Sequence, residues 1–166
     1  MRQIEKLGLE SAKNCAIDNV IDLAEMIFWN KNHGIDVTRI SSDLVPHATN
    51  PKIIEKFGKA GEEYASLKFL RPYLKKVGQV VNAEGIRVSF HPSQFVQLAS
   101  PTVSIYEMSV KELDMHVKYF DMMGVDKNAV IVIHIGGTYK NKPETIVRFI
   151  ERFREMPQRI RDRVVL

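Results

Sequence analysis

The feature that most constrains the fold is a regular exchange of amphipathic segments with short apolar ones. Helical spacing of apolar residues runs through residues 11–32, 72–85, 104–123 and 141–153, with a shorter helical stretch at 52–58. Strand-like runs stand at 36–40, 86–90, 129–135 and 164–166. The run at 129–135 is continuously apolar, which is typical of a parallel strand covered on both faces. Strands that alternate with helices predict an α/β fold with a parallel sheet or barrel.

No linker or low-complexity stretch divides the sequence, so we expect residues 1–166 to form a single domain. The chain opens on a helical segment and stops inside a strand-like one. A parallel sheet of three or four strands would then have two unpaired edges. We therefore expect a partial TIM barrel, built from β/α repeats, as a piece of a larger barrel.

Composition indicates the class of protein, but it says little about the function. Hydrophobic residues make up 45% of the chain and charged residues 27%, as in ordinary globular domains. No apolar run is long enough to cross a bilayer, Met1 leads directly into polar residues, and Cys15 is the single cysteine. We expect a protein of the cytoplasm, or of the nucleus in a eukaryote, that is not secreted and has no membrane partner. The net charge of +4 permits a polyanionic partner without establishing one.

Two histidines stand at the ends of neighbouring predicted strands. His91 follows the run at 86–90, and His134 lies near the end of the run at 129–135. Functional groups of parallel α/β folds lie at the carboxyl ends of strands, and imidazole is a common ligand for Mn, Fe and Zn. The pair predicts half of a metal site, although a hydrogen-bonded structural pair fits the residues about equally well. Carboxylates are missing from these strand ends, so we expect further ligands elsewhere.

Two loop segments carry weaker signals. The loop after His91 mixes amides with apolar groups, among them Gln94 and Phe95, where a polar loop is expected. An aromatic residue and a Gln at a loop tip can wedge into a base stack. Packing of Phe95 against the barrel rim is the simpler interpretation of the residues alone. Gly136 and Gly137 would let a phosphate approach the backbone, but a tight turn explains them as well.

Three segments together resemble the UV damage endonuclease family: residues 39–46 (RISSDLVP), 89–101 (SFHPSQFVQLASP) and 133–142 (IHIGGTYKNK). The likeness runs through nearly the whole chain. It implies a TIM barrel related to endonuclease IV and the xylose isomerases, of which this chain holds about the second to fourth strands and the start of a fifth. It also implies an enzyme that nicks DNA immediately 5′ of a UV photoproduct with a cluster of divalent metals, typically manganese.

The resemblance assigns metal ligands. It implies that His91 and His134 bind metal, and it places Asn50 where the family usually has a histidine. An amide oxygen is the weaker ligand. The family's first strand and its later Glu, Asp and His ligands have no counterpart here, so we expect the isolated chain to cut DNA poorly.

The resemblance also assigns contacts to damaged double-stranded DNA. Gln94 and Phe95 take the places of a probing pair that inserts at the damaged dinucleotide, where Tyr is frequent in place of Phe95. We expect Gly136, Gly137 and Tyr139 to contact the DNA as well. Damaged steps stack poorly, so a wedge there costs less than in intact duplex.

Two other functions remain open on the sequence. One is a different TIM-barrel metalloenzyme, such as a sugar isomerase of the xylose isomerase type, against which the Gln94-Phe95 loop argues. The other is a non-catalytic DNA-binding fragment that needs a second chain to complete the barrel.

Overall fold

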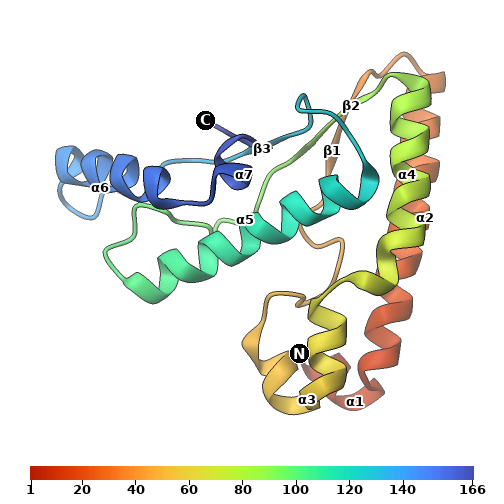
Figure 1. The fold of residues 1–166 in the computed structure, drawn as a ribbon, viewed down its shortest axis with the longest axis horizontal. Helices are drawn as coiled ribbons and strands as arrows, with labels where there is room; N and C mark the ends of the chain where they lie inside the picture. Colours follow the sequence, from red (N-terminus) through yellow and green to blue (C-terminus); the bar gives the residue numbers. More distant parts are fainter.

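The computed structural model describes residues 1–166 as a parallel sheet with helices packed against it (Figure 1). The elements are, in chain order, α1 (Arg2–Leu7), α2 (Leu9–Asn32), β1 (Val37–Ile40), α3 (Pro51–Ala65), the 3-10 turn η1 (Lys68–Leu70), α4 (Arg71–Glu84), β2 (Arg87–Phe90), α5 (Val103–Met123), β3 (Val130–Val132), α6 (Lys142–Glu155), α7 (Gln158–Arg161) and β4 (Val164–Val165).

The sheet has the order β1-β2-β3-β4, and every neighbouring pair is parallel. The predicted exchange of strands and helices is therefore confirmed. The sheet does not close on itself, so β1 and β4 are its two edges. This open arrangement is the one expected for part of a barrel.

The strand registers decide which side chains face the helices. Ile40 pairs with Phe90, and Phe90 pairs with Ile131, and all three side chains are at most 1% exposed. Residues of the other parity face away from these helices: Arg39 and Arg87 are exposed, whereas Ser89 and Val130 are 8% and 9% exposed. Because side chains alternate along a strand, His91 and His134 continue the parity of the side not packed in the core.

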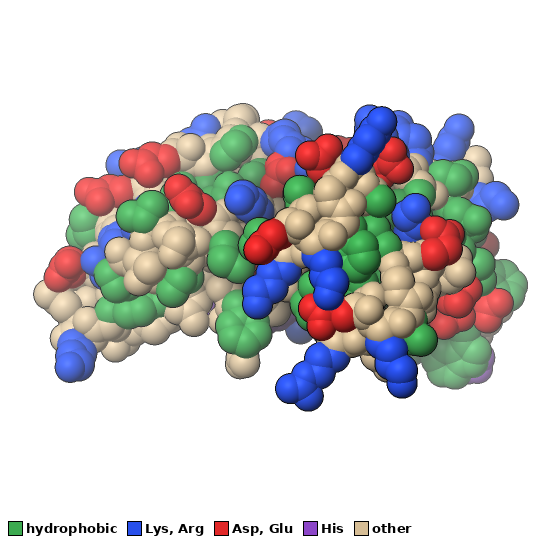
Figure 2. All heavy atoms as spheres, turned by 90° about the horizontal axis from the view of Figure 1, so that it is seen from below, with side chains coloured by type: hydrophobic (Ala, Val, Ile, Leu, Met, Phe, Trp, Pro, Cys, Tyr) green, Lys and Arg blue, Asp and Glu red, His purple; other side chains and the backbone are tan.

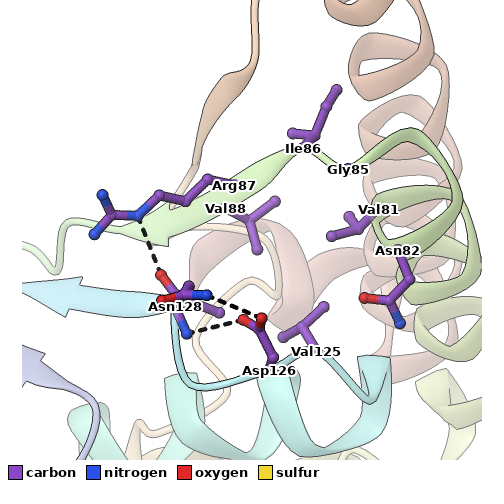
Figure 3. Close-up of a pocket in the computed structure, with 10 residues that line it drawn as sticks. Val81, Asn82, Gly85, Ile86, Arg87, Val88, Val125, Asp126 and Asn128 are labelled. Carbon is purple, nitrogen blue, oxygen red and sulfur yellow. Dashed lines mark hydrogen bonds between the residues drawn. The ribbon is translucent and has the colours of Figure 1, made fainter.

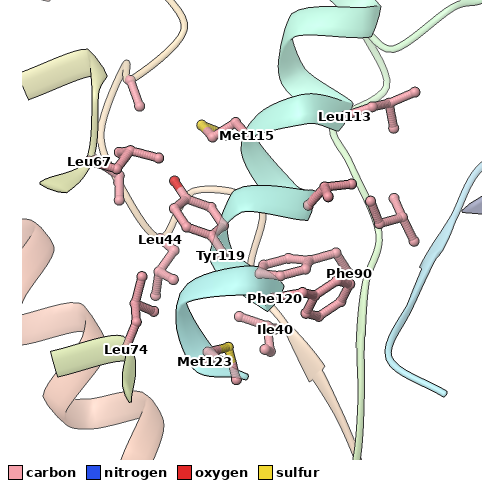
Figure 4. Close-up of a cluster of buried hydrophobic side chains, with 14 of the residues drawn as sticks. Ile40, Leu44, Leu67, Leu74, Phe90, Leu113, Met115, Tyr119, Phe120 and Met123 are labelled. Atoms are coloured by element: carbon pink, nitrogen blue, oxygen red, sulfur yellow. The ribbon is translucent and has the colours of Figure 1, made fainter. Parts of the chain in front are cut away.

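The core between the sheet and the helices is aromatic. Phe90 of β2 lies against two rings of α5, with ring centroids 5.1 Å from Phe120 and 5.6 Å from Tyr119. Figure 4 shows these rings beside aliphatic side chains from β1 and the loop that follows it. Burial of these rings holds α5 against the side of β2 that faces the core.

The helices approach one another closely on the same side. Figure 1 shows α2 and α4 running alongside each other, and α4 packs in turn on α5. At Gly78 of α4, an added Cβ would lie only 1.7 Å from the carbonyl oxygen of Met123 in α5. Only glycine permits this separation of the two helix axes.

The structure differs from the sequence prediction in two helices. The helix expected at 52–58 continues to Ala65, but it breaks at Gly58, where φ is +51° and ψ is −128°. The short helix α1 was not predicted; it buries only Ile4 and therefore has little apolar periodicity. No helix combines the length and the apolarity that crossing a membrane requires.

Charge is distributed evenly over the face drawn in Figure 2, where Lys and Arg side chains alternate with Asp and Glu. The net charge of +4 therefore does not gather into one basic stripe on this face. On this face, bulk charge does not single out a functional site.

Candidate functional site

The two predicted histidines lie side by side at the carboxyl end of the sheet. Their Nε2 atoms are 3.1 Å apart, and their ring centroids are separated by 4.9 Å. Both line a cavity of about 280 Å³ together with Ser93, Gln97 and Gly136. Parallel pairing of β2 with β3 brings the two strand ends together, as the sequence predicted.

The tautomer of His91 follows from its neighbour. Its Nδ1 donates a hydrogen bond of 3.0 Å to the carbonyl oxygen of Pro92, so Nε2 carries a lone pair that faces His134. Metal-binding histidines commonly have their second ring nitrogen held in this way. His91 thus presents Nε2 as an acceptor or a ligand.

The spacing of the pair suits a shared cation. Two ring nitrogens about 2.1 Å from one metal, at an angle of about 90–110°, stand about 3.0–3.4 Å apart. The observed 3.1 Å between the Nε2 atoms fits this range. It also suits a hydrogen bond donated by His134 Nε2 to His91 Nε2, so the geometry fits the structural alternative too.

The other predicted ligand lies elsewhere. Asn50 is the N-cap of α3, where its Oδ1 accepts from the backbone N–H of Lys52 at 3.0 Å. It lines a second cavity with Pro51 and Ile54, and is not among the residues around the histidine pair. No group of three or more His, Cys, Asp or Glu side chains gathers in a metal-holding arrangement. The metal role of Asn50 stays a prediction.

The loop after His91 forms a turn with an exposed tip. The N–H of Val96 donates to the carbonyl of Ser93 at 3.0 Å, which places Gln94 and Phe95 at the two central positions. Gln94 is exposed, and Phe95 is 73% exposed. Phe95 therefore packs little against the chain beyond lining a cavity with Ile105 and Met108 of α5, which argues against the simpler interpretation of this residue.

Both ends of this turn are bound to α5. Glu112 Oε1 accepts from the N–H of Ser93 at 3.2 Å and from its hydroxyl at 3.1 Å. Ser109 Oγ accepts from the N–H of Gln97 at 2.9 Å. Burial raises the pKa of the Glu112 carboxyl, and the two bonds from Ser93 oppose that shift.

The predicted glycine segment lies against the same loop. Gly136 has φ of +102° and lines the cavity of the histidine pair. The Tyr139 hydroxyl donates to Gln97 Oε1, and the Tyr139 ring lies 3.8 Å from where a Cβ on Gly137 would stand. The predicted DNA contacts are thus gathered at one end of the sheet, and their role in binding remains a prediction.

Comparison with known proteins shows the family and the fold of this chain. The family model described as UV-endonuclease UvdE matches residues 2–166. The chain belongs to the UvdE family. The crystal structure of SacUVDE matches with a TM-score of 0.81 and 32% identity, over 94% of this chain and 50% of that one. The fold is therefore part of the UvdE TIM barrel, as predicted.

Curated UvdE relatives are similar at the same level. The UV-damage endonuclease of Schizosaccharomyces pombe is 34% identical over 98% of this chain and 26% of its own length. The UV DNA damage endonuclease of Bacillus pumilus is 30% identical over 97% of this chain and 49% of its own. The chain spans half or less of the length of these UvdE proteins.

Sequence reasoning missed the residues of this UvdE chain that hold the loop. Beyond Glu112 and Ser109 of α5, Arg148 Nε donates to the Ala99 carbonyl at 2.9 Å, and Arg152 donates to the Leu98 carbonyl at 3.2 Å. One signal was available. Ser109, Glu112 and His116 are spaced by three and four residues, which puts polar groups in line with the buried face of α5.

Proposed function

We propose that this chain acts in DNA repair as part of an endonuclease that nicks the backbone 5′ of UV photoproducts in double-stranded DNA. One observation carries the proposal. An imidazole pair spaced for a shared cation and an exposed Gln94-Phe95 turn lie at the same end of the sheet, in a chain of the UvdE family. Family membership argues against a sugar isomerase.

We assign the metal to the imidazole pair. His91 and His134 would hold a divalent cation, for which Mn²⁺ is the expected ion, and Asn50 remains a further ligand in this proposal. Such an ion, when bound, activates water and offsets negative charge on a phosphate. The chain itself orients the pair, since the bond from His91 Nδ1 to Pro92 keeps Nε2 free to bind.

We assign lesion recognition to the turn. Phe95 would insert at the poorly stacked damaged step while Gln94 hydrogen-bonds to exposed base edges. Gly136 and Gly137 lack side chains that would keep a phosphate from their backbone. Tyr139 would line the same surface, because its ring packs beside Gly137.

A second function has a specific observation behind it. Two imidazoles with no third His, Cys, Asp or Glu beside them make a weak metal site. The chain could therefore bind damaged DNA without cutting it, and could need a second chain that completes the barrel.

One assay separates the two functions. A duplex with one pyrimidine dimer is incubated with the chain and Mn²⁺, and cleavage and binding are both measured. The control is the double variant His91→Ala/His134→Ala. Nicking 5′ of the dimer that the variant loses supports the endonuclease. Preferential binding without nicking supports the binding function, and equal affinity for damaged and undamaged duplex contradicts both.

A further inference from the structure

The turn that carries Gln94 and Phe95 is fastened at both ends by one helix. Ser93 is bound through its N–H and its hydroxyl to Glu112, and Gln97 is bound through its N–H to Ser109. Ser109 and Glu112 are three residues apart on α5, so they lie on the same side of that helix. The turn is thus connected to a rigid element at its first residue and just after its last.

The fastening residues are themselves held in place. Ser109 is 1% exposed, and its hydroxyl donates to the Ile105 carbonyl at 2.7 Å, which orients its lone pairs toward Gln97. Glu112 is half-buried, and the next residue of the helix, Leu113, lies in the core. Neither contact involves the tip, so all three bonds can be kept while the tip meets a ligand.

The side chains of the tip have no such support, although Gln97 Nε2 donates to the Gln94 carbonyl at 3.3 Å. Phe95 is 73% exposed, and the Gln94 side chain has no hydrogen bond within the chain. A free turn of this kind would sample many conformations, and binding would have to restrict them. Restriction before binding lowers that cost, so the three bonds to α5 would favour recognition.

We propose that Glu112 and Ser109 are positioning residues that clamp the 93–97 turn to α5 and hold Gln94 and Phe95 ready for insertion into damaged DNA. The clamp is a property of the chain alone, whereas its use in recognition rests on the proposed function. Loss of the bonds to either residue should loosen the tip and reduce lesion preference without unfolding the chain.

The first arm of the test measures the tip without DNA. The chain has one tryptophan, Trp29. Trp29→Phe with Phe95→Trp therefore leaves a single indole at the tip, whose motion is followed by time-resolved fluorescence anisotropy. Glu112→Ala and Ser109→Ala, each added to this background, should increase the amplitude of fast motion. Glu112→Gln should not, because its amide oxygen can still accept both bonds from Ser93.

The second arm measures recognition in the native background. The readout is the ratio of affinities for a dimer-containing duplex and the same undamaged duplex, in which the general effect of charge cancels. Glu112→Ala should lower the ratio by about tenfold, as expected for lost hydrogen bonds to a charged group. Glu112→Gln should restore it. Glu107→Ala, an exposed change on the same helix, should match the wild type.

The outcomes are distinguishable. A tip that stays equally ordered in Glu112→Ala and Ser109→Ala overturns the clamp, whatever the DNA results. A loosened tip with an unchanged affinity ratio overturns its role in recognition. A wild type without lesion preference overturns the proposed function, and the anisotropy arm still decides the clamp. Circular dichroism on each variant confirms that the fold is retained.

Discussion

The two ends of the parallel sheet use similar chemistry for different purposes. At the amino end, Arg87 Nε donates to the Asn128 carbonyl at 3.2 Å, and the Asn128 N–H donates to Asp126 Oδ1 at 2.8 Å (Figure 3). At the carboxyl end, Glu112 and Ser109 bind the backbone of a turn. Both ends therefore rely on side chains that fasten loops.

The two ends differ in which side chains face solvent. The loop bonds at the amino end join groups of that end to one another, whereas the carboxyl end leaves an imidazole pair and a bare aromatic tip facing solvent. The cavity at the amino end, about 370 Å³, is larger than the 280 Å³ beside the histidines. Cavity size therefore does not distinguish the carboxyl end; its exposed turn and imidazole pair, to which we assign recognition and metal binding, do. We expect changes at the amino end and in the core to affect stability, and changes at the carboxyl tip to affect recognition.

The largest loss of stability is expected from Gly78→Ala. Its Cβ would stand 1.7 Å from the Met123 carbonyl oxygen, so α4 and α5 must move apart near the amino end. The free energy of unfolding should fall by about 3 kcal/mol or more, since backbone cannot yield as a side chain can. Urea denaturation measures this. The neighbouring exposed change Gln79→Ala should be neutral or slightly stabilising, and equal effects of the two would contradict the close approach.

The next largest effect is a dependence on pH. His116 is fully buried against Phe90, and burial lowers its pKa from 6.5 to about 4. The unfolded chain therefore takes up this proton first as pH falls below about 6.5, and stability drops until about pH 4. From pH 7 to pH 5 the loss from His116 should be about 2 kcal/mol.

Comparison with His116→Gln isolates this effect, because glutamine does not titrate. The raised pKa of Glu112 acts in the opposite direction and is common to both proteins. The stability difference between wild type and His116→Gln should shift by about 2 kcal/mol over this range in urea denaturation. A constant difference would mean that His116 protonates freely in the folded chain.

A smaller loss is expected from Arg163→Met at the amino end. Arg163 donates to the carbonyls of Val125 at 3.2 Å, Ala129 at 3.1 Å and Asp126. Removing these bonds should lower the free energy of unfolding by about 1–2 kcal/mol. The exposed Arg154→Met is the matched control for lost charge. Lesion preference should be unchanged in both, and its loss in Arg163→Met would break the division between the two ends.

The smallest effect on stability is expected from Phe95→Ala, and here recognition should change instead. A side chain that is 73% exposed buries little surface, so the free energy of unfolding should change by less than about 0.5 kcal/mol. Leu7→Ala, at 60% exposure, is the control. If the affinity ratio for damaged over undamaged duplex survives Phe95→Ala, the tip is not the wedge.

Sequence patterns predicted the parts of this fold that local rules control. Apolar spacing located the strands and the long helices, because burial of one face imposes that spacing. The meeting of His91 with His134 was also predictable, since parallel neighbouring strands bring their carboxyl ends together. Gly58 was expected to end a helix and instead interrupts one, because the chain resumes helical geometry beyond it.

The fastening of the loop could not be predicted in the same way. Arg152 and Leu98 are 54 residues apart, and their contact depends on how α6 docks beside α5. Asn50 illustrates the opposite limit. Family resemblance predicts a ligand there, while the local position before Pro51 makes Asn50 a helix cap. The sequence alone does not rank the local role of Asn50 as a helix cap against the ligand role that the resemblance implies.

The side chains that fasten the turn are also synthesised in a fixed order. Every side chain that holds residues 93–100 from outside the loop comes later in the chain, from Ser109 to Arg152. At about 5–20 residues per second, a ribosome reaches Arg152 roughly 3–10 seconds after it has made Leu98. Over that interval the side chains that fasten the loop are added in order, first Ser109 and Glu112 and last Arg152. The bonds to Ser109 and Glu112 can therefore form before those from α6, so the turn is first fastened by the helix that follows it in the chain.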